Sequence, residues 1–263
     1  MTHHHLTPAA FLALALASSG AQAQEADQPV DNGTNPARFN TTAIVSYETA
    51  DLDQGISIDT FELSYIQPFT ADKDYNIRFK LPFARIDGAN SVFSDNFDLG
   101  DAQVKISHLA KKDMKNLTAL VIGAEMSFDT AARPELGAGQ NVLKLNATYA
   151  KGLSNKAIFA PAVVHSISLW GDDGRAKVNN TVFDFYYVPK LKNPKYFITF
   201  DPSITLDWET DAQFIGLATT FGRVIGPAFG GNSVMYIKPS TFLGGDAPPI
   251  NWGIEVGYKL IGF

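Results

Sequence analysis

The feature that most constrains this chain is an alternation of apolar and polar side chains. In Tyr75–Phe83 (YNIRFKLPF) every second residue is aromatic or aliphatic, and the residues between them are Asn, Arg, Lys and Pro. Successive side chains of a β-strand point to opposite faces, so this period of two predicts a strand with one apolar and one polar face. The 3.6-residue period of an amphipathic helix is almost absent, and the sequence therefore predicts an all-β fold.

The alternation recurs along the chain in twelve segments. Eight segments carry it clearly: Phe61–Phe69, Tyr75–Phe83, Ala102–Ile106, Leu120–Phe128, Leu143–Tyr149, Thr181–Tyr187, Ile198–Trp208 and Trp252–Leu260. Four carry it more weakly: Phe39–Thr49, Ile158–Leu169, Ala212–Arg223 and Val234–Leu243. The link Glu209–Asp211 is shorter than the pattern requires, so a count between ten and fourteen strands stays open.

The first residues have the composition of an export signal. The apolar run Ala9–Ala17 (AAFLALALA) is too short to cross a bilayer as a helix, and the small residues Ala21 and Ala23 have the spacing that a signal peptidase accepts. No Lys or Arg precedes the run, which leaves the amino terminus to provide the positive charge. We expect residues 1–23 to be a signal peptide, residues 24–37 a flexible tail and residues 38–263 a β-barrel.

Composition excludes several classes of protein. The chain has no cysteine, so disulfides cannot stabilise it. Its net charge of −6 and the lack of a basic stripe argue against a nucleic-acid partner. No segment after residue 23 approaches the roughly 20 apolar residues that a membrane helix needs. A membrane location would therefore require a closed barrel of strands.

Three observations favour a transmembrane barrel over a soluble two-sheet sandwich, which the alternation alone would also allow. Aromatic residues such as Phe69 and Tyr75 flank the predicted short turns, as in the aromatic girdle at a membrane interface. Most segments approach the roughly 9–11 residues that a tilted transmembrane strand needs. The chain also ends on the aromatic Phe263, as outer-membrane proteins usually do. We therefore expect an antiparallel up-and-down barrel of about twelve strands in the bacterial outer membrane.

The connections between the segments alternate in length. Those after even-numbered strands are short, such as Thr70–Asp74 and Lys111–Asn116, whereas those after odd-numbered strands include Asp87–Phe97, Asp129–Gly139 and Trp170–Lys177. Outer-membrane barrels have short periplasmic turns and longer extracellular loops. The alternation therefore predicts that both termini lie in the periplasm.

The end of the chain predicts macromolecular partners. The strand that ends at Phe263 would be recognised by the barrel-assembly machinery, and the apolar outer face would contact outer-membrane lipid and lipopolysaccharide. Phe263 is out of step with the apolar face of Trp252–Leu260. This mismatch predicts a bulge near Ile261 and Gly262.

Charged side chains share the face opposite the apolar residues. A Lys or Arg facing lipid near the midplane costs about 2–4 kcal/mol, so the consistent phase predicts that these charges line the lumen. The candidates for solute selectivity are Glu62, Arg78, Lys80, Asp101, Lys105, Glu125, Lys144, Asp184 and Glu255. A ring of such groups selects what passes through a pore, whereas the same groups paired with one another would only fill a closed lumen.

The sequence offers little for catalysis. His108 and His165 are the histidines that follow residue 23. Ser166 and Ser168 lie at odd spacings from His165 and would point to the opposite face of the strand, so no His–Ser dyad forms. His108 has no adjacent acid, and no Cys/His spacing suits a metal ion. The sequence therefore predicts no enzyme, no cofactor and no metal site.

The segment Leu99–Lys105 (LGDAQVK) resembles the strand opening of the outer-membrane proteins grouped as MetA-pathway phenol-degradation-like. The order of features continues through Phe128–Thr130 and Leu136–Gln140, although the usual PTG of the loop is Asp-Thr-Ala at residues 129–131. The resemblance covers residues 55–263. It implies a barrel of this size that transports aromatic or hydrophobic compounds.

Three functions are compatible with these expectations. The first is a passive channel for small solutes, hydrophobic or aromatic ones included, with Arg78, Lys80, Lys105, Glu125 and Lys144 as selectors. The second is a closed structural or adhesive barrel that acts through its longer loops. A barrel hydrolase using His165 is a third and weaker alternative.

Overall fold

The computed structural model describes residues 31–52, 55–88, 96–246 and 250–263, and these residues form a sheet of strands with one short 3-10 helix. The strands are β1 (Thr42–Asp51), β2 (Ile56–Pro68), β3 (Tyr75–Gly88), β4 (Asp98–Leu99), β5 (Gln103–Asp113), β6 (Thr118–Ser127), β7 (Gln140–Gly152), β8 (Ile158–Gly171), β9 (Asn179–Val188), β10 (Tyr196–Asp207), β11 (Gln213–Ala228), β12 (Gly231–Gly245) and β13 (Trp252–Ile261). The 3-10 helix η4 spans Pro134–Leu136.

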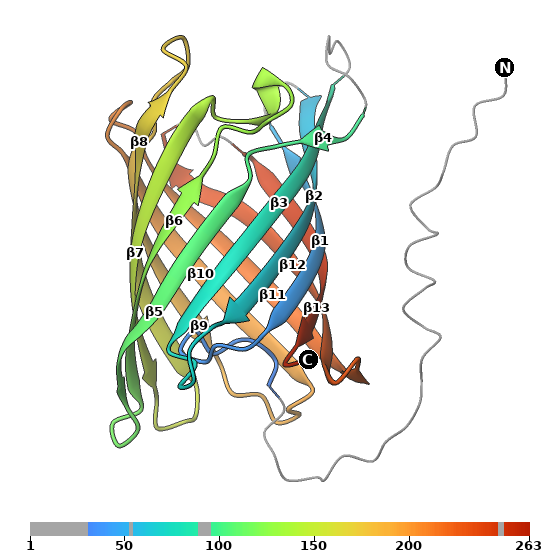
Figure 1. Cartoon of the computed structure of the whole chain (residues 1–263), viewed down its shortest axis with the longest axis vertical. Helices are drawn as coiled ribbons and strands as arrows, with labels where there is room; N and C mark the ends of the chain where they lie inside the picture. The colour runs from blue at the N-terminus through green and yellow to red at the C-terminus, as the bar shows by residue number, and fades with distance from the viewer. Residues whose placement is uncertain (1–30, 53–54, 89–95, 247–249) are drawn as a thin grey trace, which may run out of the picture.

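The sheet closes on itself (Figure 1). Neighbouring strands pair antiparallel, and β1 pairs with β13 from Thr42 opposite Ile261 to Asp51 opposite Trp252. The two-residue strand β4 pairs with β3 beyond the last β5 partner and adds no separate wall element. The predicted all-β antiparallel barrel is therefore confirmed, with twelve strands in its wall.

The two faces of the wall differ as the alternation predicts. On β3, the outward-facing Phe79 and Leu81 are 44% and 43% exposed, while Arg78 and Lys80, which alternate with them, point inward and form ion pairs. Large apolar side chains are exposed on the outer face of every wall strand. A strand that buries only its inner face keeps this period, because each residue reverses the side-chain direction.

The described connections at the two ends of the barrel differ only partly in length. The connections 69–74, 114–117, 153–157, 189–195 and 229–230 lie at one end, called here the turn end, together with the carboxyl terminus (Figure 1). The connections 128–139, 172–178 and 208–212 lie at the opposite, loop end, and of these only 128–139 is longer than every connection at the turn end.

The carboxyl terminus returns to the outer face after the last strand ends. Strand β13 stops at Ile261, and Gly262 has a φ of 75°, a left-handed conformation that favours glycine. The ring of Phe263 then lies 6.5 Å from the ring of the outward-facing Tyr65. The expected change of phase therefore occurs beyond the strand and not as a bulge within it.

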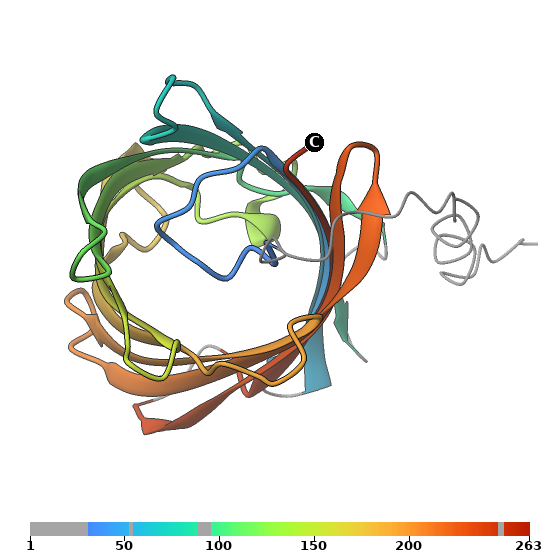
Figure 2. The ribbon, with the colours of Figure 1, turned by 90° about the horizontal axis from the view of Figure 1, so that it is seen from below.

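Residues 31–41 run across the inside of the barrel at the turn end (Figure 2). The hydroxyl of Tyr186 on β9 donates a hydrogen bond of 2.9 Å to the carbonyl of Thr34. Ala37 packs on an apolar patch of the inner wall that includes Ala150 and Ala160, and Phe39 is buried. The part of the predicted tail at residues 31–37 is thus in contact with the wall.

No helix in the part of the chain that the structure describes is long and apolar enough to cross a membrane. The predicted signal peptide at residues 1–23, and residues 24–30 of the predicted tail, lie outside the described residues. The domain boundaries stay predictions.

Candidate functional site: the charged inner wall

A row of four charged side chains crosses the inner wall. Arg78 on β3 lies opposite Lys105 on β5, Lys105 lies opposite Glu125 on β6, and Glu125 lies opposite Lys144 on β7. Glu125 binds two members of this row, with its Oε2 2.5 Å from Nη2 of Arg78 and its Oε1 3.2 Å from Nζ of Lys144. We call these four residues the charged row. It brings three cations around one carboxylate.

The side chains of the charged row differ in their exposure to water, and this difference determines how much each depends on its charged partners. The side chain of Glu125 is 8% exposed, whereas those of Arg78 and Lys144 are 30% and 31% exposed. A carboxylate removed from water needs its charged partners, while cations that keep contact with water lose less solvation. Glu125 therefore acts as the anchor, and the two cations keep part of their surface facing the lumen.

Two further ion pairs involve predicted lumen residues. Nζ of Lys80 lies 2.7 Å from Oε2 of Glu62, joining β3 to β2. The second pair joins β13 to β12. Glu255 on β13 forms an ion pair with Lys238 on β12 and also accepts a hydrogen bond from the hydroxyl of Tyr236 on the same strand. These contacts link neighbouring strands through their inward faces.

An acidic stretch lies on β9 and β10. Asp184 and Asp201 point inward, and among the described residues neither is in an ion pair within 4 Å. Oδ2 of Asp201 accepts a hydrogen bond of 3.1 Å from Thr199, while the buried Oδ1 of Asp184 has no hydrogen-bond partner within the described ranges. The inner wall thus has a cationic side on β3–β7 and an anionic side on β9–β10.

Asp101 is placed differently from the other candidates. It precedes β5, and its carboxylate accepts hydrogen bonds from the backbone amides of Thr130, Ala131 and Ala138 at 3.2, 3.2 and 2.8 Å. Asp101 therefore holds the loop between β6 and β7 instead of presenting a free charge to the lumen. Asp101 therefore does not lie on the strand face with the other charges, contrary to the expectation from the sequence, because its carboxylate is bound to the amides of a loop.

The loop that Asp101 holds enters the barrel. Leu136 of η4 is buried against Ala84 and Ile86 on the inner face of β3, and η4 lies within the ring of strands when viewed along the barrel (Figure 2). Arg175 fastens the other side of this loop through a hydrogen bond of 2.6 Å to the carbonyl of Gly137. We call residues 128–139 the inward loop.

A cavity lies between residues 31–41 and the cationic side of the wall. Its volume is about 310 Å³, and its charged lining residues are Arg38, Arg78, Lys105 and Lys259, with no carboxylate among its lining residues in the described part of the chain. Polar groups such as Asn76, Asn146 and Thr148 complete the polar lining. The charged side chains that an anion would meet in this space are all cations, although Arg38 and Arg78 are also paired with Asp31 and Glu125.

Sequence reasoning missed part of this site. Glu48 on β1 lies opposite Glu255 and faces the lumen; its even spacing from Thr42 and Ser46 was the available signal. The sequence places Arg38 at the start of the barrel and predicts no role for it, because nothing local indicates that residues before the first strand turn inward.

The two histidines on the outer face of the described strands contact neighbouring polar and aromatic side chains. Nδ1 of His165 lies 3.0 Å from Oγ1 of Thr181, which also accepts a hydrogen bond from Nε1 of Trp208. Ser166 is buried on the opposite face, as expected from its spacing. His108 stacks on Tyr75 with ring centroids 4.0 Å apart. Within the described residues, no group of three or more acidic or histidine side chains could hold a metal ion.

Comparisons with known proteins concern the fold. No family model and no curated protein matches the sequence. The COG4313 outer membrane channel from Pseudomonas putida F1 is similar with a TM-score of 0.68 and 14% identity over 91% of this chain and 100% of that chain. The NanC porin (TM-score 0.57, 10% identity, 84% and 98% covered) and the KdgM porin (0.56, 9%, 83% and 98%) are also similar. At these identities the chain shares the architecture of outer-membrane channels, and the resemblance to the MetA-pathway family stays a prediction.

Proposed function

We propose that this chain is an outer-membrane channel through which small solutes diffuse passively, with its turn end in the periplasm. The exposed apolar outer face supports a membrane location, because an apolar surface that surrounds a soluble monomer would cause aggregation. The barrel architecture shared with solved outer-membrane channels supports the same conclusion. A short-turn end in the periplasm agrees with the usual arrangement of such barrels.

The observation that carries the proposal is the charged row on the inner wall. Arg78, Lys105 and Lys144 place three positive charges around one carboxylate, beside a cavity whose charged lining is entirely cationic. Rings of charged side chains determine which ions a pore admits. This charge distribution favours small anionic solutes over cations of equal size.

The aromatic or hydrophobic solutes implied by the MetA-pathway resemblance are compatible with this wall if they carry a negative charge. Benzenesulfonate and benzyltrimethylammonium are suitable probes, because both are aromatic, similar in size and permanently charged. We expect purified barrel in liposomes to pass benzenesulfonate faster. Equal or reversed rates would contradict the proposed selectivity.

Planar-bilayer recordings test the channel itself. We expect folded protein to give discrete conductance steps and a reversal potential shifted toward that of chloride in a KCl gradient. Absence of any ion or solute flux from folded, inserted protein would exclude a channel.

A second function has a specific observation in its favour. The inward loop lies inside the barrel at the loop end, and residues 31–41 cross the barrel at the turn end. Both segments therefore narrow the lumen. A closed barrel that acts through its loops would keep the ion pairs for stability alone. In that case Lys144→Gln would lower the melting temperature without changing permeability.

A further inference from the structure

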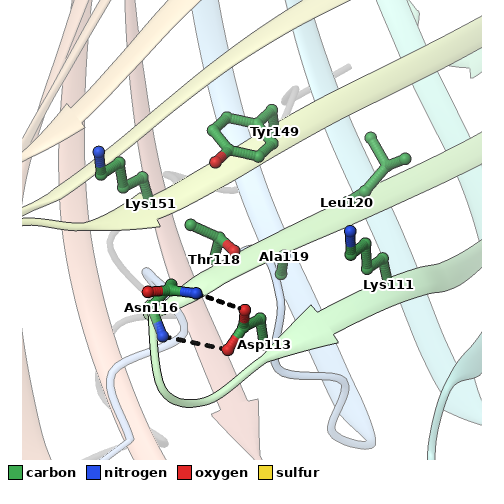
Figure 3. A pocket seen from close by; sticks show the side chains of 8 residues that line it. All are labelled: Lys111, Asp113, Asn116, Thr118, Ala119, Leu120, Tyr149 and Lys151. Carbon is green, nitrogen blue, oxygen red and sulfur yellow. Dashed lines mark hydrogen bonds between the residues drawn. The ribbon is translucent and has the colours of Figure 1, made fainter.

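A pocket of about 480 Å³ lies at the turn end, on the outside of the wall (Figure 3). It is formed by the ends of β5, β6 and β7 and by the turn 114–117. Its lining residues are Lys111, Asp113, Asn116, Thr118, Ala119, Leu120, Tyr149 and Lys151. The pocket is separate from the charged row, and the proposed channel does not use it.

The register of the three strands explains how the pocket forms. Lys111 lies opposite Leu120, which lies opposite Tyr149; one step closer to the turn, Thr118 lies opposite Lys151. The pairing of β5 with β6 shifts between Leu109 and Lys111, and this irregularity turns Lys111 to the outer face. The two lysines therefore stand on either side of Thr118 (Figure 3).

The polar groups of the pocket suit an anion. Lys111 and Lys151 offer ammonium groups, and Thr118 and Tyr149 offer hydroxyl donors. The one carboxylate, Asp113, is already occupied: it accepts hydrogen bonds from the amide of Lys115 at 2.9 Å, and from the backbone and side-chain nitrogens of Asn116 at 3.1 and 2.6 Å.

The surrounding charge has the same sign. The segments 111–117 and 151–157 contain five lysines and one aspartate. Lysines close to a membrane surface attract anionic lipid. The pocket thus lies within a locally positive part of the turn end.

The apolar side chains next to the pocket indicate which kind of anion would bind there. Ile106, Ile122 and Leu145 lie on the same outward face toward the middle of the barrel and are 49%, 42% and 50% exposed. A ligand that fills the pocket and also covers these side chains needs an anionic head group joined to apolar chains, which is the chemistry of an anionic phospholipid. Tyr149, 47% exposed, stands between the polar and the apolar part, the position that an amphipathic ring favours at a membrane interface.

We propose that this pocket binds the phosphate head group of an anionic phospholipid in the membrane leaflet at the turn end. Lys111 and Lys151 hold the phosphate oxygens, Tyr149 donates to the same head group, and the acyl chains lie along Leu120 and Ile122. The assignment relies on the membrane location proposed above.

The test measures phospholipid retention by native mass spectrometry. Folded barrel in detergent is titrated with phosphatidylglycerol, with Lys111→Gln/Lys151→Gln compared against Lys190→Gln/Lys192→Gln, which removes two exposed charges from another turn. We expect the pocket variant to bind roughly 10- to 30-fold more weakly, because it loses two direct charge-assisted contacts to the phosphate. The control variant loses only long-range attraction, which salt screens, and should bind less than about three-fold more weakly. Equal losses in the two variants would overturn the site, because they would indicate diffuse attraction.

Two further measurements test the tyrosine contact and distinguish a lipid from free phosphate as the ligand. Tyr149→Phe, which keeps both charges, should weaken binding by a few-fold, and it replaces the double variant if that variant fails to fold. Millimolar inorganic phosphate should not displace the lipid, and displacement would assign the pocket to free phosphate. If the wild-type protein does not insert into bilayers, the proposed membrane location and the proposed lipid site are both wrong. If it inserts and retains the lipid but conducts no ions, only the proposed channel function is wrong.

Discussion

Arg78 reaches past the intervening strand β5 to Glu125 on β6, with 2.5 Å between Nη2 and Oε2. Lys105 lies between them in the register without a salt bridge of its own among the described residues. The carboxylate of Glu125 thus gathers cations from two sides of the wall. Its removal is the most direct way to separate the stabilising role of the charged row from its role in selectivity.

Glu125→Gln should lower stability and increase anion selectivity. The substitution leaves Arg78 and Lys144 without their carboxylate, and we expect a loss of about 1–2 kcal/mol because both cations keep partial contact with water. The net charge of the row becomes more positive, so the reversal potential should move further toward chloride. Glu62→Gln removes another lumen carboxylate and its pair with Lys80, so an equal shift in that variant would show that the effect is not specific to the charged row. An unchanged reversal potential together with a lower melting temperature would favour the closed barrel.

Asp101→Asn should release the inward loop. The carboxylate accepts three backbone hydrogen bonds, and an amide side chain has one acceptor oxygen in place of two. Hydrogen bonds to charged groups contribute about 1.5–3 kcal/mol, so the loop should open roughly ten-fold more often. Cleavage after Glu135 by the glutamate-specific protease Glu-C reports the opening, and conductance should rise with it. Asp129→Asn, an exposed change in the same loop, should leave both unchanged; similar effects in the two variants would contradict the anchoring role.

Deletion of residues 31–39 should raise the conductance. These residues cross the turn end and are fastened by the hydrogen bond from Tyr186 to Thr34. Tyr186→Phe removes only this contact and should have a smaller effect of the same sign, whereas Tyr187→Phe on the outer face should have none. If the deletion leaves conductance unchanged, the segment does not limit passage.

The strands were predictable because their determinants are local. Alternation within each strand sets the face of each side chain, so the inward position of Arg78, Glu125 and Lys144 follows from counting residues. The entry of residues 31–41 and of the inward loop into the lumen was not predictable. Those segments have no periodicity, and their positions depend on contacts with distant strands, such as Leu136 against Ala84.

A charged pair on the outer face also departs from the alternation rule. Asp59 and Arg85 share the phase of the apolar residues, yet they pair at 2.9 Å near the loop end, where Arg85 also lies 5.0 Å from the ring of Phe97. Alternation distinguishes inward from outward positions. It does not indicate how far along the strand the apolar band ends.

Gly262→Ala should impair folding because it strains the backbone at this residue, and for no other reason. A Cβ at this position would meet no atom within 4 Å, so any effect comes from the φ of 75°, which costs an L-residue about 1–2 kcal/mol. Relief of that strain would move Phe263 away from Tyr65, and the yield of heat-modifiable, folded barrel should fall. Gly244→Ala is the matched control, because its Cβ also meets no atom and its φ is not in the left-handed region. Equal yields from the two variants would show that the turn at Gly262 does not position the terminal aromatic residue.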